Sequence, residues 1–255
     1  MKNKSSEPHR QEDAFTLIEL LVVITIIGTL AGLLLPAIAK AKTAAKEKMA
    51  GVDMANLNAS IAGYYGEYST LPASTNAATA AAANLLGHNP GGDFTFGTEV
   101  QGAPSSPMNG QTIVNVSLVG ANVTSLGSQY QNVNSEVIAI LTDAAYYPEN
   151  SHIYNPQKTP FFNGKLVTDT NSPGIGPDCV LRDPFGMPYM ITLDLNYDGK
   201  CYDSIWWGKL YPNAGNTNFF VSGSSMIWSF GQYKKFDPTG SPTSPINKHL
   251  LTSWK

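Results

Sequence analysis

The chain has 255 residues, of which 42% are hydrophobic and 14% charged, and its formal net charge is −3 at pH 7. This length is enough for one globular domain beside a long helix. Outside residues 40–48 the chain has no basic stripe. Composition and charge therefore argue against nucleic-acid binding, and we expect no nucleic-acid partner.

The first 14 residues mix acidic, basic and polar side chains without periodicity. Such a pattern is typical of a segment that forms no helix or strand of its own. We therefore interpret residues 1–14 as a leader peptide in front of the first structured element.

Residues 15–35 form an apolar run whose only charge is Glu19. As a helix rising ~1.5 Å per residue, this run would cover about 30 Å, the thickness of the hydrocarbon core of a bilayer. A carboxylate near the bilayer centre costs roughly 2.5–3.5 kcal/mol, and such groups usually have a partner. Glu19 lies near the helix start, where the positive end of the helix lowers that cost. The run predicts a transmembrane helix with a functional carboxylate.

The helical pattern continues beyond Pro36 through residues 40–68, which are rich in alanine. Apolar side chains recur there at steps of three and four, which predicts one buried stripe. The stripe comprises Met54, Leu57, Ile61, Tyr65 and Tyr68. We expect one helix over residues 15–68, transmembrane over 15–35 and amphipathic over 40–68, with its second part packed on a globular domain.

Residues 69–132 are low in charge and rich in small and polar side chains, so we interpret them as a loop-rich insertion. Residues 73–84 favour either a short helix or a flexible tract. Residues 112–119 alternate apolar and polar side chains, which predicts a strand.

Residues 133–255 are expected to form the globular C-terminal region. Asn134 is positioned to cap a helix that ends before Pro148. A turn rich in Pro and Gly then leads into a strand at 190–193, and further strands are expected at 219–221 and 226–230.

The order of leader, then Phe-Thr-Leu-Ile-Glu-Leu-Leu-Val-Val-Ile from Phe15 onward, resembles the processing motif of type IV prepilins and type II secretion pseudopilins. The resemblance implies that a prepilin peptidase cuts between Ala14 and Phe15 and that the new amine of Phe15 is methylated. It also implies that Glu19 pairs with the N-terminal amine of a neighbouring subunit. The chain departs from the family at Ala14, where the family has glycine.

Two C-terminal patterns extend the resemblance. The turn from Asp183 to Tyr189, Asp-Pro-Phe-Gly-Met-Pro-Tyr, resembles the turn before the C-terminal sheet of major pseudopilins, and the ending Ser253-Trp254 is similar to theirs. The resemblance implies an α+β, pilin-like fold, in which a long N-terminal helix packs on a small antiparallel sheet. It further implies a non-enzymatic fibre subunit that assembles with itself and other pseudopilins through its N-terminal helix. Before assembly the subunit would be a single-pass inner-membrane protein with a periplasmic or extracellular C-terminal domain.

Two other interpretations of the apolar run stay open. One is an ordinary membrane anchor. The other is a secretory signal peptide, since Ala37-Ile38-Ala39 has the form of a cleavage site and basic residues precede the run. Either would suit an anchored or secreted binding protein or hydrolase. However, the run is longer than a signal peptide's apolar region of about 7–15 residues, and the four histidines are scattered without metal spacing.

One loop has the chemistry of a ligand site. Asp194, Asn196 and Asp198 place oxygens at alternate positions before a glycine, as in the first half of a calcium loop. Ile205 stands where a calcium loop has its last acid, so Asp203 would have to complete the site. Major pseudopilins bind calcium in their C-terminal loops, so the resemblance also implies calcium here. The alternative is an Asx-rich hairpin turn.

Cys179 and Cys201 are the two cysteines of the chain. If the domain is exported, they would meet an oxidising compartment, where a disulfide between them could form. The sequence leaves open whether they lie close enough to bond.

Overall fold

The structure, a computed structural model, describes residues 16–82, 92–96, 134–145, 152–203, 205–211, 215, 218–237 and 240–254. The expected leader, the cleavage site at Ala14 and Phe15, and the expected strand at 112–119 lie outside these residues. The chain divides into two compact units, Met1–Ala44 and Ala45–Lys255.

Helix α1, Leu17–Tyr68, contributes to both units. It passes through Pro36 without a break. In its first part no residue from 17 to 44 is buried, and Leu17 is 88% exposed. By length and composition, α1 is able to cross a membrane.

Within the second unit, one side of α1 is buried against the domain. The buried residues recur at steps of three and four, and they are Ala50, Met54, Leu57, Ser60, Ile61 and Tyr64. The expectation that Tyr65 belongs to this stripe is wrong, since Tyr65 is 42% exposed and Tyr64 only 2%. The reason is tertiary: Phe161 packs edge-on against Tyr64, at 5.4 Å between ring centroids, and so covers that side of the helix.

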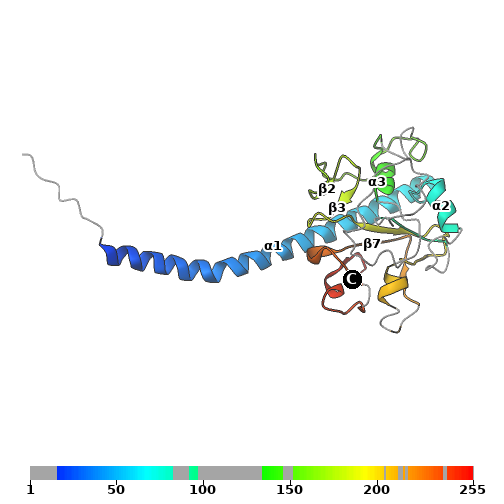
Figure 1. Ribbon diagram of the computed structural model, residues 1–255. Coiled ribbons are helices and arrows are strands. Elements are labelled where there is room, and N and C mark those ends of the chain that lie inside the picture. Colours follow the sequence, from blue (N-terminus) through cyan, green and yellow to red (C-terminus); the bar gives the residue numbers. More distant parts are fainter. Residues whose placement is uncertain are drawn as a thin grey trace, which may run out of the picture. The chain divides into compact units, whose positions relative to one another are not determined.

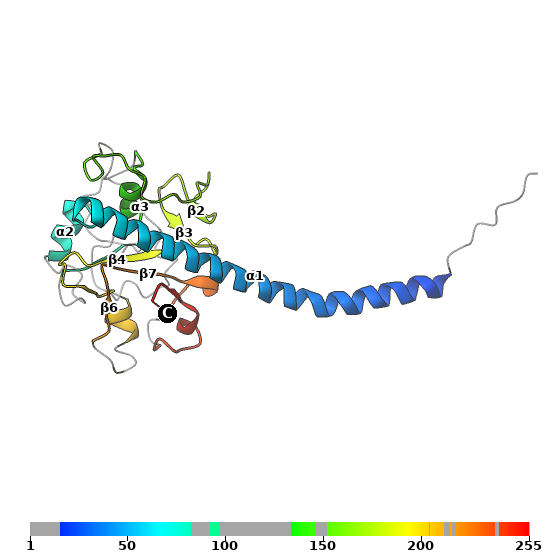
Figure 2. The same ribbon diagram turned by 180° about the vertical axis from the view of Figure 1, so that it is seen from behind.

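The main sheet has four strands in the order β1-β4-β7-β8, and every neighbouring pair is antiparallel. The strands are β1 (Phe94–Phe96), β4 (Met190–Leu193), β7 (Ser225–Ser229) and β8 (Leu251–Thr252). Figures 1 and 2 show the second half of α1 running beside β4 and β7. The long helix with its small antiparallel sheet confirms the α+β, pilin-like fold class.

Side chains alternate between the two faces of this sheet along each strand. Both faces are buried, each in its own cluster of side chains. Ile191 and Ile227 point to the α1 side, where they join Leu57 and Ile61 in one core cluster. Met190 and Trp228 point to the other side and join a second cluster, rich in aromatic rings, that includes Trp206 and Phe230.

Short elements complete the second unit. They are α2 (Thr75–Ala82), α3 (Ser135–Thr142), β2 (Gly174–Ile175), β3 (Leu181–Arg182), β5 (Lys200–Cys201), a π-helical turn η3 (Trp206–Leu210), β6 (Val221–Ser222), and the 3-10 turns η5 (Gly231–Tyr233) and η6 (Asn247–His249). β2 pairs with β3 and β5 with β6, both antiparallel.

The structure places the end of α3 before Pro148, as expected, and corrects the expected cap at its start. α3 ends at Thr142 because Asp143 adopts a left-handed conformation, with φ of 53°. Asn134 makes no side-chain cap bond to α3. Its Oδ1 instead accepts from the N–H of Leu181 at 3.0 Å, while its NH2 group donates to the carbonyl oxygens of Leu181 and Tyr189, both at 2.9 Å. These bonds join the start of α3 to β3 and to the end of the following turn.

The expected insertion also contributes to the fold. Of the two alternatives for residues 73–84, the structure shows a helix, α2. β1 was not predicted, and it adds an edge strand to the main sheet with Phe94 and Phe96 fully buried.

Candidate functional site

The first turn of α1 holds Glu19, the expected assembly carboxylate. Its Oε2 accepts hydrogen bonds from the backbone N–H of Thr16 at 2.9 Å and from the Thr16 hydroxyl at 2.6 Å. Thr16 Oγ1 accepts in turn from the N–H of Glu19 at 3.3 Å. This reciprocal arrangement is a capping box, which satisfies N–H groups that the first turn of a helix leaves without partners.

The remaining polar side chains of the apolar segment bond inside the helix. The hydroxyl of Thr25 donates to the carbonyl of Leu21 at 2.7 Å, and that of Thr29 donates to the carbonyl of Ile26 at 2.9 Å. In lipid every polar group needs an internal partner. Both threonines of the described part of the segment meet this requirement. Glu19 is the one charged side chain of the segment.

Gly28 and Pro36 are features of the same segment. Pro36 lacks the N–H that would bond to the carbonyl of Gly32, so the helix has one backbone bond fewer at that point. A Cβ at Gly28 would meet nothing within 4 Å. Among the described residues, no neighbour therefore requires glycine at this position.

The expected calcium loop forms a tight turn after β4. Asp194 Oδ2 accepts from the N–H of Gly199 at 2.8 Å, and its Oδ1 accepts from the N–H of Asp198 at 3.2 Å. Asn196 Oδ1 also accepts from Asp198, at 3.1 Å. Tyr197 and Gly199 have positive φ, of 59° and 77°. Asp194, Asn196 and Asp198 thus share one Asx-rich turn, as both alternatives require.

Asp203, the fourth expected ligand, is not part of this turn. It is fully buried on the aromatic side of the sheet, where its Oδ2 accepts from Thr192 Oγ1 at 2.7 Å and from Trp228 Nε1 at 2.9 Å. Its Oδ1 accepts from the N–H groups of Ile205 and Trp206, at the start of η3. Burial raises the pKa of Asp203, and these four hydrogen bonds oppose that rise. Both oxygens of its carboxylate are thus used in hydrogen bonds that hold the domain together.

A different acid, Asp93, lies near the loop. Its Oδ2 accepts from the N–H of Tyr202 at 2.6 Å, and the residue is 1% exposed. Burial raises the pKa of Asp93 to about 8, and the negative charges of Asp194 and Asp198 add to this effect. No sequence pattern pointed to this contact, because Asp93 is remote along the chain and stands just before the unpredicted strand β1.

Within the described residues, no group of three or more His, Cys, Asp or Glu side chains could hold a metal ion. The donor set that the sequence predicted is therefore not assembled in this structure. The acidic turn itself does concentrate negative charge, which a cation would relieve.

The two cysteines are free and lie in separate clusters, Cys179 on the α1 side of the sheet and Cys201 on the aromatic side. Burial raises the pKa of Cys179 to about 12 and holds that of Cys201 well above its ordinary value. Cys179 borders a hollow of about 400 Å³, whose lining includes no histidine or carboxylate. Both thiols therefore lack the surroundings of a reactive cysteine.

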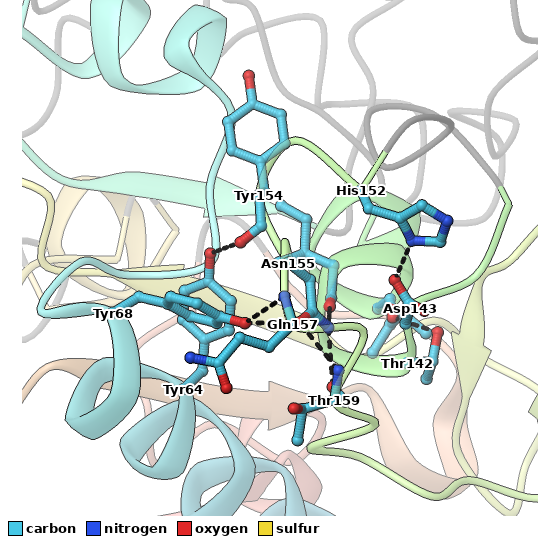
Figure 3. A network of polar contacts seen from close by, with 11 residues as sticks. Tyr64, Tyr68, Thr142, Asp143, His152, Tyr154, Asn155, Gln157 and Thr159 are labelled. Atoms are coloured by element: carbon cyan, nitrogen blue, oxygen red, sulfur yellow. Dashed lines mark hydrogen bonds and ion pairs between the residues drawn. The ribbon is translucent and has the colours of Figure 1, made fainter.

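A polar network joins the end of α1 to the loop after residue 151 (Figure 3). Tyr64 donates its hydroxyl to the carbonyl of Tyr154 at 2.5 Å, and Tyr68 donates to Asn155 Oδ1 at 2.8 Å. Asn155 Nδ2 donates to the carbonyls of Ile140 and Thr159. The network fixes the helix end to the domain. We assign it a structural role.

The N-terminal residues match one family model, the prokaryotic N-terminal methylation motif, over residues 9–35. No curated protein and no solved structure matches the chain. The motif implies processing by a prepilin peptidase and assembly with other pilin subunits. It covers the part of the chain with a capped carboxylate at the helix start and exposed apolar side chains. The methylation motif, followed by the long apolar helix α1, fits a prepilin-like protein.

Proposed function

We propose that the chain is a structural subunit of a pilus-like fibre, and specifically of the pseudopilus of a type II protein secretion system. The observation that carries this proposal is the methylation motif at the start of an apolar helix whose one charge, Glu19, lies four residues after the expected new N-terminus, Phe15. Most side chains of residues 17–35 are unburied in the single chain and need apolar surroundings. Lipid provides them before assembly, and the helices of other subunits provide them afterwards.

In this proposal the subunit first sits in the inner membrane as a single-pass protein, with its second unit in the periplasm. After cleavage, Phe15 carries an amine whose pKa near 8 leaves it mostly cationic at neutral pH. The carboxylate of Glu19 then pairs with the amine of the next subunit. Such a pair is strong in apolar surroundings, since neither charge is screened by water.

Intact-mass analysis of the exported chain tests the proposal. A chain that begins at methylated Phe15 supports it. A chain that begins at Lys40 would instead support cleavage as a signal peptide and a secreted protein. An Ala14→Leu variant is the control, because a peptidase that requires a small residue before the cut should leave the leader attached.

Glu19 provides the test of assembly. Glu19→Gln keeps an oxygen that can accept from Thr16 but removes the charge, so the helix start should be preserved while the intersubunit pair is lost. We expect the variant to insert and to be cleaved, and to form fibres at a small fraction of the wild-type yield, as measured by shearing and immunoblotting. Glu47→Gln makes the same chemical change beyond the apolar span and should assemble normally. Fibre yields that were equal for wild type and Glu19→Gln would contradict the pairing.

We further propose that the acidic turn binds calcium through Asp194, Asn196 and Asp198, without Asp203. An ion that binds only the folded turn stabilises the domain by ~2.7 kcal/mol at a hundredfold excess over its dissociation constant. Thermal melting of the full chain in detergent should therefore give a higher midpoint in calcium than in chelator. Asp198→Ala should remove the difference, and Asp169→Ala, in another turn, should keep it. A wild-type midpoint that ignores calcium would leave the turn as a structural one.

A further inference from the structure

We propose that α1 carries a lysine collar, Lys40 and Lys42, that binds the anionic headgroups of phospholipids at the end of the membrane span. The proposal rests on the membrane-anchored state described above but not on assembly into a fibre. The collar belongs to the first unit of the chain.

The position of the collar follows from helix geometry. The apolar residues of α1 run from Leu17 to Ala39, with Glu19 and two threonines among them. At ~1.5 Å per residue they cover about 34 Å, slightly more than the hydrocarbon core of a bilayer. Lys40 directly follows Ala39, so it enters the headgroup layer where the apolar surface ends. Lys42 follows within the next turn.

Among the described residues, no acidic side chain forms an ion pair with the collar. Both lysines are exposed. The ion pairs of the described residues are His152–Asp143 and Arg182–Asp178, and neither involves the collar. No Asp or Glu occurs between Glu19 and Glu47. After Glu19, the next charged residues along the helix are therefore the collar lysines, followed by Lys46.

The next lysines differ from the collar. Lys46 lies over the ring of Phe185, at 5.1 Å from its centroid, so the second unit already provides it with a partner. Lys48 is exposed but stands about 12 Å beyond Lys40 along the helix, more than the Debye length of about 10 Å at 0.1 M salt. The attraction of a membrane surface for a basic side chain falls off within that length. Lys40 and Lys42 are thus the pair placed to meet lipid phosphates.

Anionic headgroups, rather than zwitterionic ones, are the expected partners because the attraction is electrostatic. A lysine near an anionic surface gains about 1 kcal/mol, which corresponds to about a fivefold preference. An acidic segment of a protein would need to reach the same level of the bilayer, and nothing in the described residues of the first unit offers one.

Electron paramagnetic resonance of the full chain in vesicles tests the proposal. The chain is reconstituted in phosphatidylcholine that contains a minor fraction of phosphatidylglycerol, and the association of spin-labelled forms of the two lipids is compared. We expect spin-labelled phosphatidylglycerol to associate about fivefold more strongly, and the preference to fall toward parity at high salt. The variant Lys40→Gln/Lys42→Gln should lose most of the preference.

Two controls keep the result interpretable. Lys40→Arg/Lys42→Arg should retain the preference because it retains the charge. Lys48→Gln/Lys165→Gln removes two exposed charges outside the collar and should also retain it. Equal association of the two lipids with wild type, or an unchanged preference in the double Gln variant, would overturn the proposal. Flotation separates this result from the function: a chain that fails to float with vesicles overturns the membrane anchor too.

Discussion

The two halves of α1 show how one continuous helix can meet opposite surroundings. Leu30 in the first half is 62% exposed, whereas Leu57 in the second half is fully buried in the core on one side of the sheet. Both stand in regular helix with no break between them. The difference teaches that this helix continues at the same regular geometry whether or not its leucines are buried. The halves differ in whether other side chains of the chain cover their apolar residues.

Leucine truncation gives the largest contrast between the halves. Leu57→Ala leaves a cavity in a closed core and should lower the free energy of unfolding of the second unit by about 2–5 kcal/mol. Leu30→Ala removes the same atoms from an exposed site and should leave that free energy unchanged. Chemical denaturation of the full chain in detergent, followed by the fluorescence of the buried Trp206 and Trp228, measures both. Equal losses for the two variants would show that the first half also packs on the domain.

Carboxylates sharpen the comparison, because Glu19 in the first unit is exposed while Asp93 in the second is 1% exposed. The pKa of Asp93 is raised to about 8, mainly by burial. Between pH 4 and 8 the unfolded chain has lost this proton and the folded chain keeps it. Stability should therefore fall as pH rises through this window, by up to about 1.4 kcal/mol per pH unit.

Asp93→Asn isolates this contribution. Asparagine keeps an oxygen that can accept from Tyr202, but it does not titrate. The variant should show a flatter dependence of unfolding free energy on pH than wild type over the same window. Asp53, Asp183 and Asp203, whose pKa values burial also raises, contribute to the dependence that remains. Parallel pH profiles for variant and wild type would mean that Asp93 is ionised in the folded chain.

The smallest expected effect separates two neighbouring tyrosines on α1. Tyr64→Phe removes a buried hydroxyl that donates to the carbonyl of Tyr154, and it should cost about 1 kcal/mol. Tyr65→Phe changes a side chain that is 42% exposed and should stay within about 0.5 kcal/mol of wild type. The two variants differ by one residue position, so they locate the border of the packed face. A larger loss at Tyr65 would shift that border.

The sequence predicts α1 well because both of its signals are local. The length of the apolar run gives the first half, and the periodicity of Met54, Leu57 and Ile61 gives the second. The register error at Tyr65 arose because an isolated helix does not show which neighbours cover it. Phe161 and Tyr154, remote along the chain, decided in favour of Tyr64.

Pairings between distant segments account for the other differences. β1 is three residues long, too short for periodicity, and it exists because Phe94 and Phe96 pair across to β4. Asp203 stands near the acidic turn in sequence, yet it faces Trp228 in the aromatic cluster. Asn134 has the right residue type for a helix cap, but its Oδ1 accepts instead from the N–H of Leu181 in β3, at 3.0 Å. The cleavage site is predicted from local residues alone, and it lies outside the described part of the chain.

The capping box at the start of α1 has a kinetic consequence for the proposed fibre. The carboxylate that must meet a second chain is already held by its own chain, through the hydroxyl and the N–H of Thr16. Joining the proposed fibre would then exchange the hydrogen bonds from Thr16 for an ion pair with another subunit. The loss of the Thr16 bonds would help to set the rate of joining. In the proposed fibre, the carboxylate of a waiting subunit would stay bonded to Thr16 until the charged amine of another subunit displaced it. Under the proposed function, the strength of the bonds from Thr16 would therefore help to set the rate at which Glu19 pairs with another subunit.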